Sequence, residues 1–372
     1  MLTFPNKFKE SMDEFNKYTT SLKKGMENLE TLYEPRVDQV ERRISNGGCK
    51  ICRRSCTKKE IVYQDGKRKL YRYTQRAEKV APVPMLIVYA MVNRYTILDL
   101  QPDRSMIRNL LDQGQDVYLV DWGYADCMDR FMTMEDYIDG FINDCVDIIR
   151  ERHQLEAINL LGVCQGGTFS TIYAALYPEK VKNFIPMVTP IDFDNKDCLL
   201  NVWASSFDAD LMVDANNGNV PGDTMNSTYS MLQPFSLSVQ KYINMVPIME
   251  DTDKLSDFLR MESWIFDSPD QPGETLRQFV KDFYQGNKLV KGEFKLGGRT
   301  VELKNITMPV LNIYGDFDTL VPPASSKVLK QHIGSKDFQE LNYPVGHIGM
   351  FVSGKTQKTL APKISEWINK RV

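Results

Sequence analysis

Apolar residues recur every three or four positions near the start of the chain. Over residues 1–33 the spacing is helical, with mostly charged and amide residues in between, at Phe8, Met12, Phe15, Tyr18, Leu22, Met26, Leu29 and Leu32. This pattern predicts an amphipathic helical arm. Such an arm either packs on the body of its own chain or binds a partner surface, and the pattern leaves both interpretations open.

Beyond residue 60, short apolar runs alternate with amphipathic stretches. Short buried strands are expected at 85–90 and 116–121, and further strands at 157–163, 183–189, 309–315 and 338–343. Helices are expected at 103–114, 134–153, 166–177, 324–333 and 357–370. Hairpins are expected at 61–73, around an Asp-Gly turn, and at 292–304, around a Gly-Gly turn. Strands that alternate with helices in this way predict a doubly wound α/β domain.

Residues 191–290 interrupt this alternation of strands and helices. They are rich in Asp, Asn, Met, Phe and Trp and contain no clear strand. We therefore expect three parts. Residues 1–60 form the helical arm and a cysteine-bearing linker, residues 61–190 and 291–372 form the α/β core, and residues 191–290 form a cap. Ligands of such sheets bind at the carboxyl ends of the strands, so motifs at those ends carry the most weight.

Composition narrows the classes of partner. The 46 Lys and Arg nearly balance the 49 Asp and Glu, which argues against nucleic acid as a partner. The longest apolar run, 85–92, has eight residues, whereas a membrane-spanning helix needs about 18, so no transmembrane segment is expected. The first ten residues lack the pattern of a secretory signal, and the seven cysteines are scattered, which favours a reducing cytoplasm.

A candidate nucleophile follows the strand expected at 157–163. The run Gly162-Val163-Cys164-Gln165-Gly166-Gly167 has the layout of a nucleophile elbow, G-x-S-x-G, with cysteine in place of serine. The helix that begins behind Cys164 favours the thiolate and offers the backbone N–H of Gln165 to an oxyanion. A second oxyanion donor is expected from the loop after strand 85–90, at the backbone N–H of Val92 or of its neighbour within residues 91–94.

A cysteine nucleophile needs a base. Of the three histidines, His153 and His332 end predicted helices, where histidine commonly faces solvent. His347 instead lies in a glycine-flanked loop after strand 338–343, the place of the catalytic histidine in the α/β-hydrolase chain order of nucleophile, acid and histidine.

The acid is expected after strand 309–315. In hydrolases of this layout it stands three residues after the strand-ending glycine and three before Val-Pro, and both counts select Asp318. Asp316 is then a turn residue.

Two further features are ambiguous in the sequence. The run Asp121-Trp122-Gly123 ends a strand near the same edge. It is either a capped strand end with a packed Trp or part of a substrate site. Cys49, Cys52 and Cys56 form a cluster without a fourth ligand. Because structural zinc usually takes four ligands, free thiols are expected there and no metal site is predicted.

Several longer stretches resemble the catalytic subunit of class III, two-component polyhydroxyalkanoate synthases. They are LIVYAMVNRYTILDLQPDRS, GQDVYLVDWGYAD, INLLGVCQGGTFS, VTPIDF, RMESWIFDSPDQPGETLRQFVKDFYQGNKLVKGE and VGHIGMFVSGKTQK. Together they extend over nearly everything after residue 60. The resemblance places the family's catalytic Cys, Asp and His at Cys164, Asp318 and His347. The chain departs from the family pattern at Thr319, where the family commonly has His, and at the insertion-like stretch 46–60.

The resemblance implies an α/β-hydrolase fold with a cap and an acyltransferase without cofactor. Its substrates would be (R)-3-hydroxyacyl-CoA thioesters, chiefly 3-hydroxybutyryl-CoA, which it would polymerise through acyl-cysteine intermediates. It also implies a homodimer, a separate non-catalytic partner subunit and residence on cytoplasmic polyester granules. The competing interpretations are a thioesterase or polyester depolymerase that uses the same triad with water, and an inactive regulatory homologue, which the complete triad disfavours.

Overall fold

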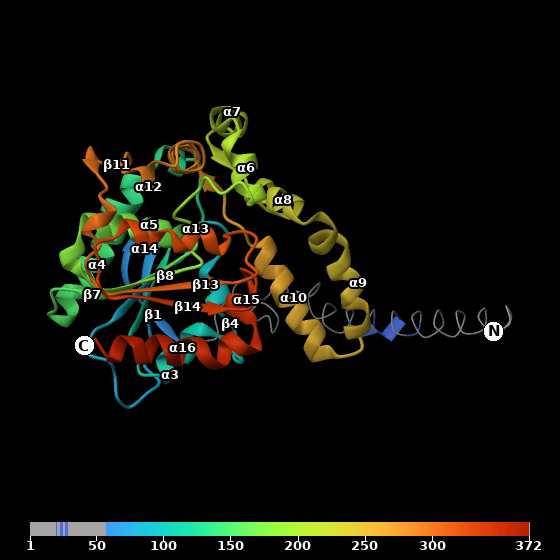
Figure 1. Cartoon of the computed structure of the whole chain (residues 1–372). Coiled ribbons are helices and arrows are strands. Elements are labelled where there is room, and N and C mark those ends of the chain that lie inside the picture. Colours follow the sequence, from blue (N-terminus) through green and yellow to red (C-terminus); the bar gives the residue numbers. More distant parts are fainter. Residues whose placement is uncertain (1–19, 21–22, 25–26, 29–56, 372) are drawn as a thin grey trace, which may run out of the picture. The chain divides into compact units, whose positions relative to one another are not determined.

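The computed structural model describes residues 20, 23–24, 27–28 and 57–371 (Figure 1). The chain divides into two compact units. The larger comprises Ser55–Met225 and Asp267–Val372, and the smaller comprises Met1–Arg54 and Asn226–Phe266. The predicted division at residues 60, 190 and 290 stays a prediction.

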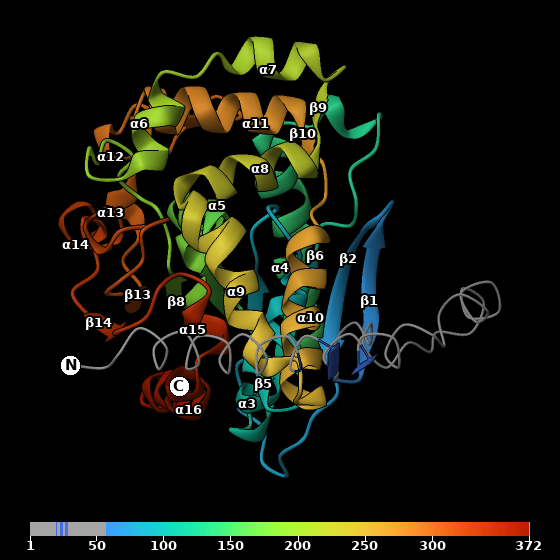
Figure 2. The ribbon, with the colours of Figure 1, turned by 90° about the vertical axis from the view of Figure 1, so that its right-hand side faces the viewer.

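The larger unit is built on one eight-stranded sheet. Its strands lie in the order β1-β2-β6-β3-β7-β8-β13-β14, with bounds Lys59–Asp65, Arg68–Tyr73, Val117–Asp121, Met85–Val88, Ile158–Val163, Val181–Met187, Val310–Gly315 and Phe338–Tyr343. The strands from β6 to β14 pair in parallel, and the hairpin β1–β2 joins antiparallel to β6 at the edge of the sheet (Figure 2). The Asp-Gly hairpin and all six strands that the sequence predicts are therefore present, and the edge strand β14 is largely exposed.

Helices cover both faces of this sheet. Figure 1 shows α3 (Met106–Asp112) and α16 (Gly354–Asn369) on one side, and α4 (Asn143–His153), α5 (Gln165–Leu176) and α13 (Pro323–Lys327) on the other. The central strands β3, β6 and β7 are buried along their whole length because helices cover both their faces. The short helices α14 (Leu329–His332) and α15 (Gly349–Val352) complete the C-terminal half.

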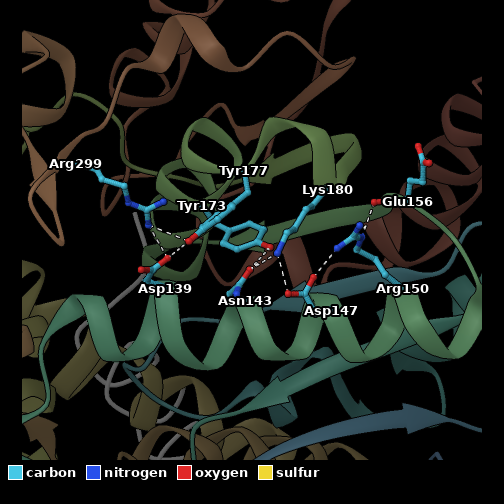
Figure 3. A network of polar contacts seen from close by, with 9 residues as sticks. All are labelled: Asp139, Asn143, Asp147, Arg150, Glu156, Tyr173, Tyr177, Lys180 and Arg299. Atoms are coloured by element: carbon cyan, nitrogen blue, oxygen red, sulfur yellow. Dashed lines mark hydrogen bonds and ion pairs between the residues drawn. The ribbon is translucent and has the colours of Figure 1, made fainter.

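The helix predicted over 134–153 has two parts, the π-helical stretch η3 (Asp136–Ile142) and α4. Figure 3 shows how polar side chains join it to α5, to the turn η4 (Pro178–Lys180) and to the hairpin β11–β12 (Lys295–Leu296, Arg299–Thr300). Lys180 Nζ donates to Asn143 Oδ1 and to Asp147 Oδ2, both at 2.8 Å. Arg299 donates to Asp139 Oδ1 at 2.6 Å. Tyr173 of α5 donates from its hydroxyl to Asn143 Oδ1 at 3.1 Å, which ties α4 to α5, the helix that begins behind Cys164.

The segment predicted as a cap is mostly helical. Within the larger unit it contains α6 (Leu199–Ser205), α7 (Ala209–Ala215), α11 (Gly273–Phe279), α12 (Lys288–Lys291) and the two-residue strands β9 (Asn219–Val220) and β10 (Gln271–Pro272). Figure 2 shows α7 beside α11, where Arg277 forms ion pairs with Asp210 and Asp214. Helix α8 (Gly222–Leu232) leads into the smaller unit, which contains α9 (Lys241–Met245) and α10 (Thr252–Phe266).

Most of the predicted arm lies outside the described residues, as do Cys49, Cys52 and Cys56. Its described positions, such as Lys24 and Asn28, are helical. Asn28 donates to the carbonyl of Met249 at 2.7 Å, a contact within the smaller unit. The arm therefore contacts its own chain at this point, and binding of a separate partner stays a prediction.

Candidate active site

Cys164 stands between β7 and α5, at a sharp turn of the backbone. Its φ of 54° and ψ of −126° lie outside the regions that most residues prefer. The turn is held by hydrogen bonds from the Cys164 N–H to the Met187 carbonyl, 3.0 Å, and from the Gly167 N–H to the Cys164 carbonyl, 2.8 Å. This is the geometry of the predicted nucleophile elbow.

The glycines around Cys164 are required by close contacts. A Cβ at Gly162 would lie 2.6 Å from Gly167 Cα, and a Cβ at Gly166 would lie 2.4 Å from the carbonyl oxygen of Val88. At Gly167 it would lie 1.9 Å from Thr189 Oγ1. Helix α5 therefore approaches the ends of β3 and β8 more closely than any side chain would permit.

The loops after β13 and β14 bring Asp318 and His347 together. Asp318 Oδ2 lies 2.7 Å from His347 Nδ1, while Asp318 Oδ1 accepts from the backbone N–H groups of Leu320 and Val321 at 2.9 and 2.8 Å. The Asp318 side chain is fully buried. Asp316 is exposed and bonds to Asn342 instead, so the choice of Asp318 over Asp316 agrees with the geometry.

His347 also interacts with Cys164. Burial lowers the pKa of the imidazole, but the charges of Asp318 and Cys164, and the side-chain hydrogen bonds to both, raise the pKa of His347 well above its ordinary value overall. Since Nδ1 faces Asp318, Nε2 is the ring nitrogen left to Cys164. The three predicted site residues thus meet at the carboxyl ends of β7, β13 and β14, although 183 positions separate Cys164 from His347.

The predicted oxyanion donors lie on the elbow and on the loop after β3. Gln165 is the first residue of α5, where backbone N–H groups have no intrahelical partner. Its side chain reaches the other loop, since Gln165 Oε1 accepts from the Met91 N–H at 3.0 Å. Val92 follows Met91 directly, and Asn93 then adopts a left-handed φ of 56°. The side chain of Gln165 is a contribution that sequence reasoning missed, because nothing local links position 165 to position 91.

A buried ion pair fixes the far end of this loop. Arg94 lies 2.9 Å from Asp121 Oδ1 and donates to the Gly123 carbonyl at 2.6 Å. Trp122, between them, donates from Nε1 to the Tyr89 carbonyl at 2.8 Å. The Asp121-Trp122-Gly123 segment is thus a strand end whose Trp is hydrogen-bonded to the start of the loop, and a role in substrate binding stays a prediction.

The other histidines lie elsewhere, and one prediction about them is wrong. His153 does not face open solvent, because its Nε2 lies 2.8 Å from the hydroxyl of Tyr118 and its side chain is only 19% exposed. His332 ends α14 and is half-buried.

Cys198 was also missed by sequence reasoning. Its thiol lies 3.7 Å from the Leu320 carbonyl, beside the loop that carries Asp318 and Thr319.

Over the described ranges, no three His, Cys, Asp or Glu side chains gather as ligands for a metal ion. None of the helices described for this chain combines the length and apolar character that crossing a bilayer requires.

Comparison with family models places the chain among known proteins. Residues 83–353 match the alpha/beta hydrolase fold, and residues 1–110 match the N-terminus of poly-beta-hydroxybutyrate polymerase (PhaC). A solved structure, a soluble variant of monoglyceride lipase from Saccharomyces cerevisiae in complex with a substrate analog, aligns with a TM-score of 0.54 over 86% of this chain and 96% of its own, at 14% identity. The α/β-hydrolase fold predicted from the sequence is confirmed.

Curated relatives are more similar. The poly(3-hydroxyalkanoate) polymerase subunit PhaC of Allochromatium vinosum is 55% identical over 84% of this chain and 88% of its own. The protein of the same name from Synechocystis is 50% identical over 97% of this chain and 93% of its own. As the motifs around Cys164 and His347 predicted, the chain belongs to the poly(3-hydroxyalkanoate) polymerase family.

Proposed function

We propose that this chain polymerises (R)-3-hydroxyacyl-CoA thioesters, chiefly 3-hydroxybutyryl-CoA, with release of CoA. The observation that carries this proposal is the meeting of Cys164, His347 and Asp318 at one edge of the sheet. A thiol nucleophile suits a thioester substrate, because one thioester replaces another at little cost in free energy, whereas a serine would form a more stable ester.

Acylation of Cys164 is the first step. The thiol passes its proton to His347 Nε2, and the thiolate sulfur forms a bond to the acyl carbon while the carbonyl electrons move to oxygen. The N–H groups of Gln165 and Val92 stabilise that oxyanion. When the carbonyl forms again, the bond to CoA breaks and the departing CoA thiolate takes the proton from His347.

Elongation uses the hydroxyl group of one acyl unit against the thioester of another. Its oxygen forms an ester bond to the acyl carbon, the carbon–sulfur bond to cysteine breaks, and His347 accepts the hydroxyl proton. Asp318 holds His347 in orientation and stabilises the imidazolium that forms. A hydroxyl is a far weaker acid than a thiol, so this step depends more strongly on the carboxylate.

The setting of the reaction follows from the family. We propose a homodimer that works with a separate non-catalytic subunit on the surface of cytoplasmic polyester granules. The relatives' designation as a subunit supports a multi-component enzyme. The predicted arm over residues 1–33 is the proposed contact for the partner.

The test is a product balance on the purified protein with (R)-3-hydroxybutyryl-CoA, alone and with its co-expressed partner. We expect CoA release in excess of free 3-hydroxybutyrate, together with polymer, whereas a hydrolase gives one free acid for each CoA. Cys164→Ala abolishes release, and Cys164→Ser leaves a trace. The matched control is Cys127→Ala, since Cys127 is an exposed cysteine of the same unit, and this variant keeps parental activity. Release by Cys164→Ala above a few per cent of the parent contradicts the proposal.

A further inference from the structure

We infer that Gln271 is a positioning residue for the oxyanion site, because its side-chain amide holds the peptide that presents the N–H of Val92. This inference rests on the proposed function, in which that N–H stabilises the thioester oxyanion. Gln271 lies in β10, 180 positions after Met91 in the chain, and its side chain is buried.

The geometry of one peptide unit carries the argument. Gln271 Nε2 donates to the Met91 carbonyl at 3.1 Å. The carbonyl of Met91 and the N–H of Val92 belong to the same planar, trans peptide, so they point in opposite directions. A hydrogen bond that fixes the carbonyl of Met91 therefore also fixes the direction of the Val92 N–H.

The preceding peptide is fixed as well. The Met91 N–H donates to Gln165 Oε1 at 3.0 Å. Two buried glutamines thus hold the two peptide units that flank Met91, one from the elbow and one from β10. Since Gln165 also begins α5 directly behind Cys164, these bonds connect both oxyanion donors to the nucleophile.

Gln271 is itself held in place. Its backbone pairs with Val220 of β9, and its Nε2 also donates to the Pro269 carbonyl at 3.1 Å. A buried amide whose two N–H bonds both go to backbone carbonyls has little freedom to turn away.

The test replaces the amide donor and separates acyl transfer from nucleophile reactivity. Gln271→Leu removes the donor, and Gln271→Met removes it with an unbranched chain of similar length. We expect kcat for CoA release to fall about 10- to 100-fold with KM changed less than about 3-fold, since deleting an oxyanion donor outright costs about 100- to 1,000-fold. The rate of Cys164 alkylation by iodoacetamide stays within about 2-fold of the parent, because attack on a saturated carbon forms no oxyanion.

The matched control is Gln278→Leu. Gln278 is a glutamine of α11 whose Oε1 accepts from the Met134 backbone N–H at 2.8 Å, in a part of the unit that bears no predicted site residue. This variant loses a comparable hydrogen bond and keeps its kcat.

Three outcomes overturn the inference about Gln271. They are an unchanged kcat in both Gln271 variants, a parallel fall in alkylation, and an equal fall in Gln278→Leu. If the parent protein itself releases no CoA, the proposed function fails instead, so the two failures are distinguishable.

Discussion

Gly166 is the position where one added methyl group tests the architecture of the site most directly. In Gly166→Ala the new Cβ would lie 2.4 Å from the Val88 carbonyl oxygen and 2.6 Å from the Tyr89 carbonyl carbon. Ordinary van der Waals contact begins at 3.4 Å, so each contact is too short by about 1 Å. The clashing atoms are backbone atoms at the end of β3, which is hydrogen-bonded to β6 and β7 on its two sides and does not move aside.

The same substitution at Gly140 provides a matched control. Gly140 also lies in a helical stretch, but a Cβ there meets nothing closer than the Glu135 carbonyl at 3.9 Å. Gly140→Ala is expected to raise the free energy of unfolding by about 0.5–1 kcal/mol, since alanine restricts the unfolded chain and favours helix. Gly166→Ala is expected to lower it by about 3 kcal/mol, at the upper end of the usual cost of overpacking.

Denaturant titrations followed by intrinsic fluorescence measure both changes, and CoA release is measured on the same preparations. Gly166→Ala also pushes the elbow away from the loop that carries Val92, so its CoA release falls with its stability. If Gly166→Ala unfolds at the parental denaturant concentration and releases CoA at the parental rate, the close approach of α5 to β3 is not required and the reasoning is refuted.

Three other predictions follow from the same geometry. Asp318→Asn slows polymer growth by about 100- to 10,000-fold, as measured by continuous CoA release, but slows the first acylation of Cys164 less. Asp316→Asn keeps parental activity, and an equal loss in both steps of the Asp318 variant argues for an orienting role alone. Although burial lowers the pKa of His347, the charges of Asp318 and Cys164 raise it overall above its ordinary value, so the imidazolium persists to higher pH than that of a free histidine and is lost as the pH rises through the raised pKa. Since the imidazolium gives its proton to the departing CoA thiolate, CoA release falls as the imidazolium is lost at high pH. This alkaline limb moves to lower pH in Asp318→Asn, where one of the charges that raise the pKa of His347 is missing; a limb that does not move contradicts this assignment. Finally, Arg94→Met removes the direct ion-pair partner of the buried Asp121, so the free energy of unfolding falls by about 3 kcal/mol, and a denaturation midpoint like that of the parent refutes this expectation.

Local patterns were sufficient for the elements and for the elbow. Alternation of apolar runs with amphipathic stretches predicted the six strands and the hairpin at residues 61–73 in their observed places. The glycines on either side of Cys164 indicated a tight turn, because the close approach of strand and helix there leaves no room for a side chain. Counting from Gly315 selected Asp318 rather than Asp316, and the structure places Asp318 against His347.

The prediction that depended on the tertiary environment of a side chain was wrong. His153 was expected in solvent because it ends a helix, but the fold places the Tyr118 hydroxyl against its Nε2. A helix end is a local property, whereas its environment is set by the strand that happens to lie beside it.

By itself the sequence determined the order of strands and helices, the strained turn at Cys164 and the chain order of nucleophile, acid and base. Hydrophobic periodicity and glycine placement are set by the backbone geometry of a few neighbouring residues, so both can be recognised in the sequence. Only the tertiary structure decided that Gln165 and Gln271 both bond to the backbone of Met91. These contacts join residues 74 and 180 positions apart. They depend on the order in which the strands assemble and on where the cap segment returns to the sheet, and no local spacing encodes either.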